Sequence, residues 1–230
     1  FKYIEEKDVF QTFYSKMLAK RLIHGTSHSE YLEGQMISKL KQNCGYDYTS
    51  KLARMFGDIT VSKELLGRYL SVATKEAQLI DFTVLVLATG SWPLQPPNSL
   101  FTIPKEMSVC ELQFTRFYQG EFSGRKLAWL HQLSKGEVKT KYGPSSGFTF
   151  QCSTYQMGVL VQFNTSKEIT AEDLQIATQL NDTILRQTLL SLVRTKVLEM
   201  EPEDENIGKD HKFKVNFGYK RWVAQFLGRD

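Results

Sequence analysis

The spacing of apolar side chains divides the chain into three consecutive regions. In the first third, apolar residues recur every three or four positions, which is the repeat of an amphipathic α-helix. The first stripe consists of Phe10, Phe13, Tyr14, Met17 and Leu18. Gly25 ends this helix, and further stripes follow around Ile37, Met55 and Tyr69, of which the last two can share one helix. The first third is therefore predicted to be a helical bundle.

The middle third changes to a period of two, which is typical of β-strands. The alternation predicts four strands, at residues 80–87, 127–133, 138–142 and 148–152. Between the first two strands, Pro104 suits the first turn of a helix that runs to about Tyr118. Alternation also places Trp129 in the core, on one face with Leu127, His131 and Leu133. We expect a small, mainly antiparallel sheet with one covering helix.

The last third returns to a helical period. Thr170 and Asn181 suit the N-caps of two further helices. A strand at 197–200 and an alternating strand around Phe213 are separated by an acidic loop, residues 201–210. Three helices, a strand, a long loop and a strand are the order of a winged helix. The predicted fold class is therefore α+β with several subdomains: a helical bundle, then the small sheet, then a winged helix.

The composition is that of a folded chain, with 41% apolar, 12% aromatic and 23% charged residues. Its longest apolar run is too short for a membrane span, and its start lacks a basic-then-apolar signal region, so we expect an intracellular protein. Three widely spaced cysteines, Cys44, Cys110 and Cys152, indicate core thiols rather than disulfides or metal ligands. The sequence lacks a starting Met and opens within a helical pattern, so we expect an excised fragment.

The net charge of +4 comes from the first third, residues 1–75, with 12 basic and 8 acidic side chains. The two signs are interleaved there, which favours a solvated surface over a stripe that follows phosphates. The winged helix adds little positive charge. Between Asp182 and Val193 the only cation is Arg186, and residues 201–205 carry four acidic side chains that phosphates would repel. Nucleic-acid binding is therefore the alternative function, and a disfavoured one.

Three motifs invite a catalytic or metal-binding interpretation. Ser145 lies in a G-x-S-x-G string, but a strand follows it where a serine hydrolase needs a helix, so a hairpin turn is expected. His24 and His28 have a metal-ligand spacing, but Gly25 breaks the helix between them. His131 is expected to be a core imidazole. With no paired-carboxylate, C-x-x-C or phosphate-loop motif, the sequence predicts no catalytic residues, metal site or cofactor.

Six strings of residues are similar to the cullin homology region, in family order and at family spacing. They are residues 1–10 (FKYIEEKDVF), 17–22 (MLAKRL), 48–56 (YTSKLARMF), 90–93 (GSWP), 122–130 (FSGRKLAWL) and 153–157 (STYQM). The resemblance is greatest to the cullin-1 and cullin-2 branch. It ends at Lys220, because residues 221–230 depart from the charged strand of the family and form an atypical tail.

The resemblance implies a rigid, non-catalytic scaffold subunit of a multi-subunit ubiquitin ligase. By analogy, residues 1–78 are most of a four-helix bundle, 79–152 the α/β subdomain for the RING subunit and 153–218 the first winged helix. The family's amino-terminal repeats, which bind the substrate adaptor, have no counterpart in this sequence. Nor does its final winged helix, whose lysine accepts a ubiquitin-like modifier.

The implied partner is a RING-H2 zinc protein, which recruits the ubiquitin-conjugating enzyme and so links this chain to it indirectly. A sheet of few, short strands leaves edge groups that need a partner, so we expect the RING protein to add a strand. The candidate contact residues are Val84, Val86, Leu127, Trp129 and Leu130. Cullin-exchange factors and enzymes that remove the modifier are further candidate partners. We expect cytoplasmic and nuclear localisation, with neither nucleic acid nor a membrane as partner.

Overall fold

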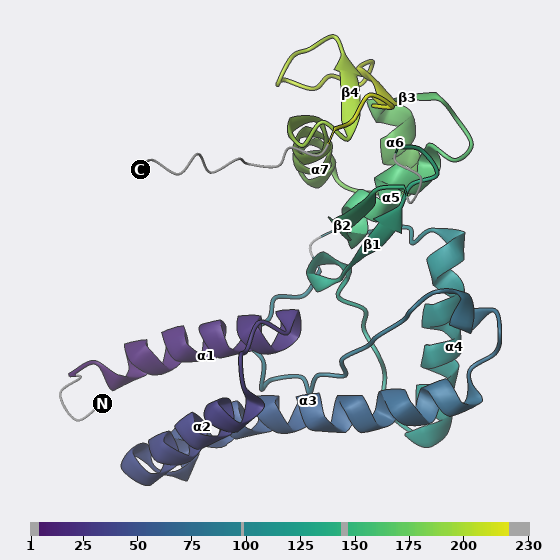
Figure 1. Cartoon of the computed structure of the whole chain (residues 1–230). Coiled ribbons are helices and arrows are strands. Elements are labelled where there is room, and N and C mark those ends of the chain that lie inside the picture. Colours follow the sequence, from purple (N-terminus) through teal and green to yellow (C-terminus); the bar gives the residue numbers. More distant parts are fainter. Residues whose placement is uncertain (1–4, 98, 144–146, 221–230) are drawn as a thin grey trace, which may run out of the picture. The chain divides into compact units, whose positions relative to one another are not determined.

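The computed structural model describes residues 5–97, 99–143 and 147–220, which form two compact units (Figure 1). The first unit comprises residues 1–96 and 107–127, and the second comprises 97–106 and 128–230. The tail at 221–230 and Ser145 lie outside the described residues.

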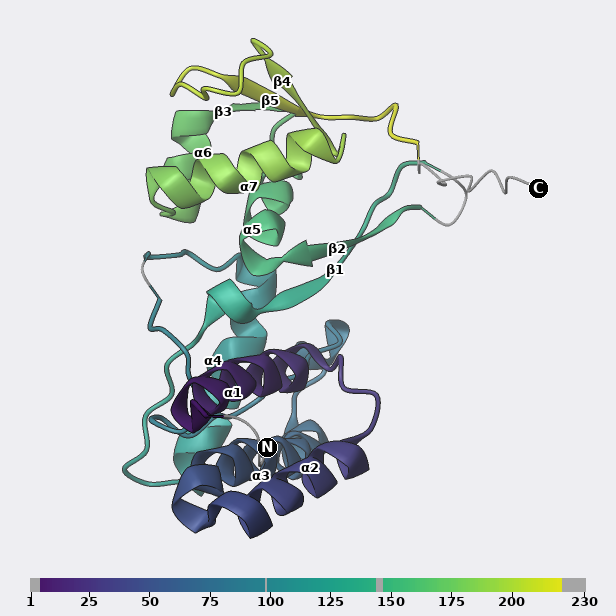
Figure 2. The ribbon, with the colours of Figure 1, turned by 90° about the vertical axis from the view of Figure 1, so that its left-hand side faces the viewer.

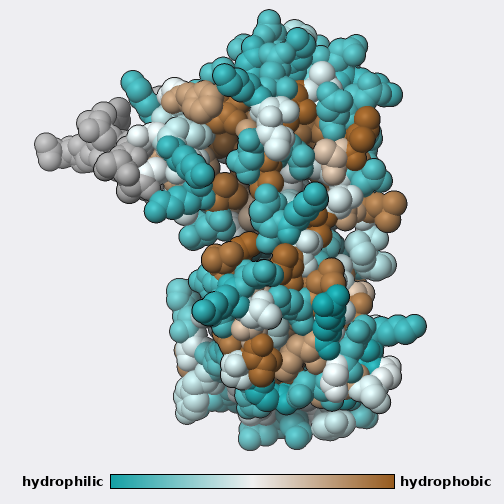
Figure 3. Space-filling view, turned by 90° about the vertical axis from the view of Figure 1, so that its right-hand side faces the viewer, coloured by the Kyte–Doolittle hydropathy of each residue, from teal (hydrophilic) through white to brown (hydrophobic). Residues whose placement is uncertain are grey.

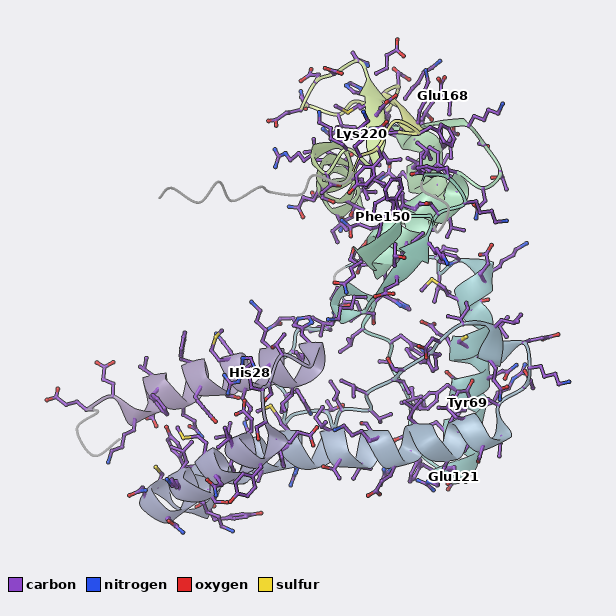
Figure 4. The ribbon with its side chains drawn as sticks, viewed as in Figure 1. His28, Tyr69, Glu121, Phe150, Glu168 and Lys220 are labelled. Carbon is purple, nitrogen blue, oxygen red and sulfur yellow. The ribbon has the colours of Figure 1, made fainter. Side chains whose placement is uncertain are left out.

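The first unit is helical, as the sequence predicts. Its elements are α1 (Lys7–His24), α2 (Glu30–Cys44), α3 (Tyr46–Val72), the short 3-10 helix η1 (Ala77–Leu79) and most of α4 (Lys105–Glu121). Gly25 ends α1 in the left-handed conformation, with φ of 64°, which glycine adopts without steric cost. The stripes around Met55 and Tyr69 belong to the single helix α3. Beside α3, α2 runs in the opposite direction (Figure 1). Arg68, near the end of α3, forms an ion pair at 2.5 Å with Glu121, which Figure 4 labels at the end of α4.

The core of the first unit is assembled from the inward faces of α1, α2 and α3. Its buried members are Leu18, Ala19, Leu22, Ile37, Leu40, Leu52, Met55, Ile59 and Trp92. Phe13, which lies on the predicted apolar stripe, is 62% exposed. The buried residues of α1 are Leu18, Ala19 and Leu22, while Phe10 and Tyr14 nearer its start are partly buried against the same core.

The strands predicted at 80–87 and 127–133 are absent from both sheets of the described residues. Burial does alternate over the first of them: Phe82, Val84 and Val86 are half-buried, whereas Asp81 and Thr83 are exposed. Alternation reports an extended backbone against a surface, but a strand also needs a paired neighbour. In the second segment, residues 131–133 form the 3-10 helix η2, and Trp129 is half-buried rather than in the core.

The second unit begins with a two-stranded hairpin, β1 (Lys135–Lys139) and β2 (Thr149–Ser153). The strands are antiparallel, with Val138 opposite Phe150. The predicted strand pair is thus present, with β1 three residues earlier than expected. The helix that packs on both strands is α5 (Thr154–Gln162) and not, as predicted, the helix that follows Pro104. The buried residues of that helix, α4, instead contact Tyr69 and Ala77 in the first unit.

The rest of the second unit has the element order of a winged helix. After α5 come β3 (Glu168–Thr170), α6 (Ala171–Thr178), α7 (Asp182–Arg194), β4 (Leu198–Glu201) and β5 (Lys212–Val215). The strands form one antiparallel sheet in the order β3-β5-β4, which lies against α6 and α7 in Figure 2. Both predicted N-caps are present, because Thr170 accepts the amide of Asp173 and Asn181 accepts that of Ile184. The predicted α+β fold class is therefore confirmed.

A close approach between Phe101 and α5 generates the first prediction. A Cβ added to Gly158 would lie 2.8 Å from the Phe101 ring, which packs on His131 and Tyr155 with centroid distances of 5.3 and 5.1 Å. Gly158→Ala should therefore lower the free energy of unfolding by about 1 to 3 kcal/mol, as overpacking does. Gly67→Ala in α3, where the new Cβ meets nothing within 4 Å, should raise it by about 0.5 to 1 kcal/mol. Urea denaturation measures both; equal stabilisation by the two would contradict the close contact.

The second prediction compares two tryptophans. Trp92 is 8% exposed and belongs to the core of the first unit, whereas Trp129 is half-buried. Trp92→Ala should cost about 3 to 5 kcal/mol of unfolding free energy, the usual range for truncating a buried tryptophan, and Trp129→Ala distinctly less. Thermal or urea unfolding of the two variants provides the comparison. A larger loss for Trp129→Ala would show that residues 127–133 form part of a core after all.

Candidate functional site

The candidate site is the extended segment, residues 81–88, which runs along α3 and belongs to neither sheet of the described part of the chain (Figure 1). Two of the predicted contact residues, Val84 and Val86, lie in it, and both are half-buried. Leu85 between them is 37% exposed. The two valines therefore share one side of the segment and Leu85 lies on the other.

Two polar side chains of α3, Asp58 and Ser62, hold the carboxyl-terminal part of this segment. The Val86 amide donates to Ser62 Oγ at 2.8 Å, and the same hydroxyl lies 3.2 Å from the Val86 carbonyl and 2.6 Å from the Asp58 carbonyl. Asp58 Oδ2 accepts the Ala88 amide at 2.8 Å and the indole N–H of Trp92 at 2.7 Å. Ser62 is only 1% exposed, so its bonds to Val86 form where water would not replace them, whereas the bond between Asp58 and the Ala88 amide is exposed.

The spacing of the two side chains matches the repeat of an extended chain. Asp58 and Ser62 are four residues apart, which is about 6 Å along a helix axis. Val86 and Ala88 are two residues apart, about 6.6 Å along an extended backbone. Two side chains one turn apart on α3 can therefore accept hydrogen bonds from alternate residues of a segment that runs antiparallel to the helix.

The amino-terminal part of the segment is anchored by aromatic packing. The Phe82 ring lies 6.1 Å from both the Tyr69 ring of α3 and the Phe114 ring of α4, and those two rings are 5.2 Å apart. Figure 4 shows Tyr69 near the carboxyl-terminal end of α3. Burial raises the pKa of Tyr69, which keeps its hydroxyl neutral near pH 7. The segment is thus held at its start by aromatic packing and at its end by hydrogen bonds from Val86 and Ala88 to α3.

The other three predicted contact residues lie in a second segment, residues 125–130, that also joins neither sheet of the described residues. Leu127 ends the first unit, while Trp129 and Leu130 belong to the second. All three are half-buried. The five candidates are thus divided between the units, with Val84, Val86 and Leu127 in the first and Trp129 and Leu130 in the second.

Sequence reasoning missed Asp58 and Ser62. The signal was nevertheless present, because Ser62 occupies a position of the α3 stripe that continues the buried series Leu52, Met55 and Ile59. A hydroxyl at a core position of a helix needs a hydrogen-bond partner, and here it finds the backbone of another segment.

The motifs weighed for catalysis do not come together in the described residues. His24 lies in the last turn of α1, and His28 lies in the following loop (Figure 4). Burial lowers the pKa of His131, whose ring packs on Phe101. Across residues 5–97, 99–143 and 147–220, no group of three or more His, Cys, Asp or Glu side chains is placed to hold a metal ion.

The charges of the winged helix are paired locally. Arg186 lies 2.8 Å from Asp182, and Arg194 lies 2.9 Å from Glu205 in the acidic loop. On the sheet, Glu168 binds Lys212 and Lys214, and hydrogen bonds from these two lysines lower the pKa of its carboxyl. Phosphates would have to displace carboxylates from both arginines of α7, which disfavours a nucleic-acid interface.

Exposed apolar side chains are spread over both units. In the view of Figure 3 they alternate with polar side chains over the surface. The most exposed members among the described residues include Tyr31, Leu79, Leu100 and Phe217. The described helices include none with the length and apolar character required to span a membrane.

Two family models match the chain. The model described as Cullin alpha solenoid domain matches residues 1–66, and the Cullin alpha+beta domain matches residues 86–219. Cullin-1 of Dictyostelium discoideum is 60% identical over 227 residues, which are 96% of this chain and 30% of that protein. Cullin-1 of Schizosaccharomyces pombe is 43% identical and human Cullin-4A 37%, each over 96% of this chain and 29% of the relative. This chain, which spans less than a third of the length of those relatives, belongs to the cullin family.

Proposed function

We propose that this chain is a non-catalytic scaffold of a cullin-RING ubiquitin ligase, in which it holds a RING-H2 zinc protein. That protein recruits the ubiquitin-conjugating enzyme, so the transfer chemistry belongs to the partners and the product is a ubiquitinated substrate destined for degradation. Membership of the cullin family supports the scaffold role. The extended segment supports the mode of binding.

The observation that carries the proposal is an extended backbone without a strand beside it. Residues 81–88 belong to neither sheet of the described residues, yet side chains of α3 and α4 hold them in place. An extended peptide can pair with such a backbone by main-chain hydrogen bonds, while its alternate side chains enter apolar positions. The amino-terminal segment of the RING protein is the proposed guest.

The five candidate residues have different tasks in this proposal. Val84 and Val86 present apolar surface on one side of the extended segment, next to the backbone that pairs with the guest. Leu127, Trp129 and Leu130 belong to a second segment outside both sheets, which offers a further backbone edge and three half-buried apolar side chains. We propose that both segments contact the RING protein.

Other partners follow from the same proposal. The ubiquitin-conjugating enzyme is bound indirectly, through the RING subunit, and cullin-exchange factors and modifier-removing enzymes act as regulators. The complex works in the cytoplasm and the nucleus. Neither a nucleic acid nor a membrane is a proposed partner.

The third prediction tests this function by co-purification. The chain should capture a RING-H2 protein that carries its amino-terminal segment at least about tenfold better than one that lacks it, because main-chain pairing provides much of the affinity. Trp129→Ala should weaken capture, whereas Lys20→Glu on the exposed surface of α1 should leave it unchanged. Equal capture of the two forms of the RING protein would refute strand addition.

A further inference from the structure

The hydrogen bonds of the extended segment all lie on one of its two edges. Within the described residues, side chains of α3 bond the backbone of Val86 and Ala88, whereas the backbone groups of Thr83, Leu85 and Leu87 make no hydrogen bond. In an extended chain the N–H and C=O of one residue point to the same edge, and those of the next residue point to the other. The edge that faces α3 is therefore bonded at Val86 and Ala88, though not at Val84, and the opposite edge is open at Thr83, Leu85 and Leu87.

We infer that Asp58 and Ser62 are positioning residues, whose side chains bond to the backbone of the even-numbered residues of the segment. A guest strand then bonds to the backbone on the opposite edge, at Thr83, Leu85 and Leu87. The identity of the guest rests on the proposed function. The assignment of the closed edge, which is the edge bonded to α3, does not rest on the proposed function. Every bond that defines this edge lies within the first unit.

Asp58 contributes a strong part of this closure. Its Oδ2 accepts two N–H groups, the Ala88 amide and the Trp92 indole, and hydrogen bonds to an ionised carboxylate are stronger than neutral ones. Trp92 is itself buried in the core of the first unit. Asp58 thereby ties the end of the segment to a fixed group, and the bonds of Ser62 then hold Val86 two residues earlier.

A segment held in this way is prepared for binding. Ordering a backbone costs conformational entropy, and a receptor strand that is already extended incurs less of that cost when the guest arrives. The same arrangement selects the guest by its pattern. Side chains of an added strand continue the two faces of the segment, one with Phe82, Val84 and Val86, the other with Asp81 and Thr83. The fitting guest is an extended peptide with apolar side chains at alternate positions.

The fourth prediction is tested first on the chain alone, by amide hydrogen exchange. The amides of Val86 and Ala88 should be protected, and those of Thr83, Leu85 and Leu87 should exchange quickly. Ser62→Ala should reduce the protection of Val86 about three- to tenfold. Ser71→Ala, which removes an exposed hydroxyl bonded to the Arg68 carbonyl in the same helix, should leave it unchanged.

Asp58 is tested by a graded pair of variants. Asp58→Ala should reduce the protection of Ala88, and Asp58→Asn, whose amide oxygen still accepts, should restore most of it. The buried Leu65 amide of α3 reports global unfolding, so a change confined to Val86 or Ala88 is a local effect. In the parent chain, exchange of Val86 as fast as that of Leu85 would overturn the closed edge.

A matched pair of variants at Leu85 then tests whether the guest uses the open edge. Leu85→Pro removes an amide that makes no hydrogen bond within the described residues, whereas Leu85→Ala shortens the side chain and keeps that amide. Capture of the RING-H2 protein should fall at least about tenfold for Leu85→Pro and much less for Leu85→Ala. Equal losses would overturn the edge assignment. If the parent chain captures no RING-H2 protein, the proposed function fails, and the exchange pattern of the free chain still decides the inference.

Discussion

The arrangement of the first unit depends on backbone amides that bond to side chains where no strand offers carbonyl groups. Within the described residues the extended segment has no neighbouring strand, and the amides of Val86 and Ala88 bond instead to side chains of α3. Ser62 and Asp58 meet this need because one helical turn and two extended residues cover nearly the same distance. Asp58 also accepts the indole N–H of Trp92, a buried member of the helical core.

The helical parts of the fold could be predicted well from the sequence because their signals are local. Gly25 ends α1, and the side chains of Thr170 and Asn181 cap α6 and α7, as expected of those residue types. Phe13 shows the limit of the helical stripe: periodicity identifies an apolar face but does not say whether another element covers it.

The strands were harder to predict because pairing is a property of two segments. Residues 81–88 alternate as a strand does, and the alternation correctly reports which side chains are half-buried. It carries no information on whether a neighbour supplies hydrogen bonds. The candidate site was thus located in part, at Val84 and Val86, while the groups that hold it were missed. The role of Asp58 and Ser62 depends on their bonds to a segment that lies 24 to 30 residues further along the chain.

The division into two units has a consequence for how the chain reaches its folded state. Residues 97–106 belong to the second unit although the first unit contains the residues on both sides of them. Their hydrogen-bond partners are residues that the ribosome adds much later. The Thr102 amide donates to the Thr178 carbonyl, and the Asn181 amide donates to Ser99 Oγ. During synthesis, the first unit can therefore mature around an insert that remains unsatisfied until most of the chain has left the ribosome. A cut at any single peptide bond would likewise fail to yield both units intact.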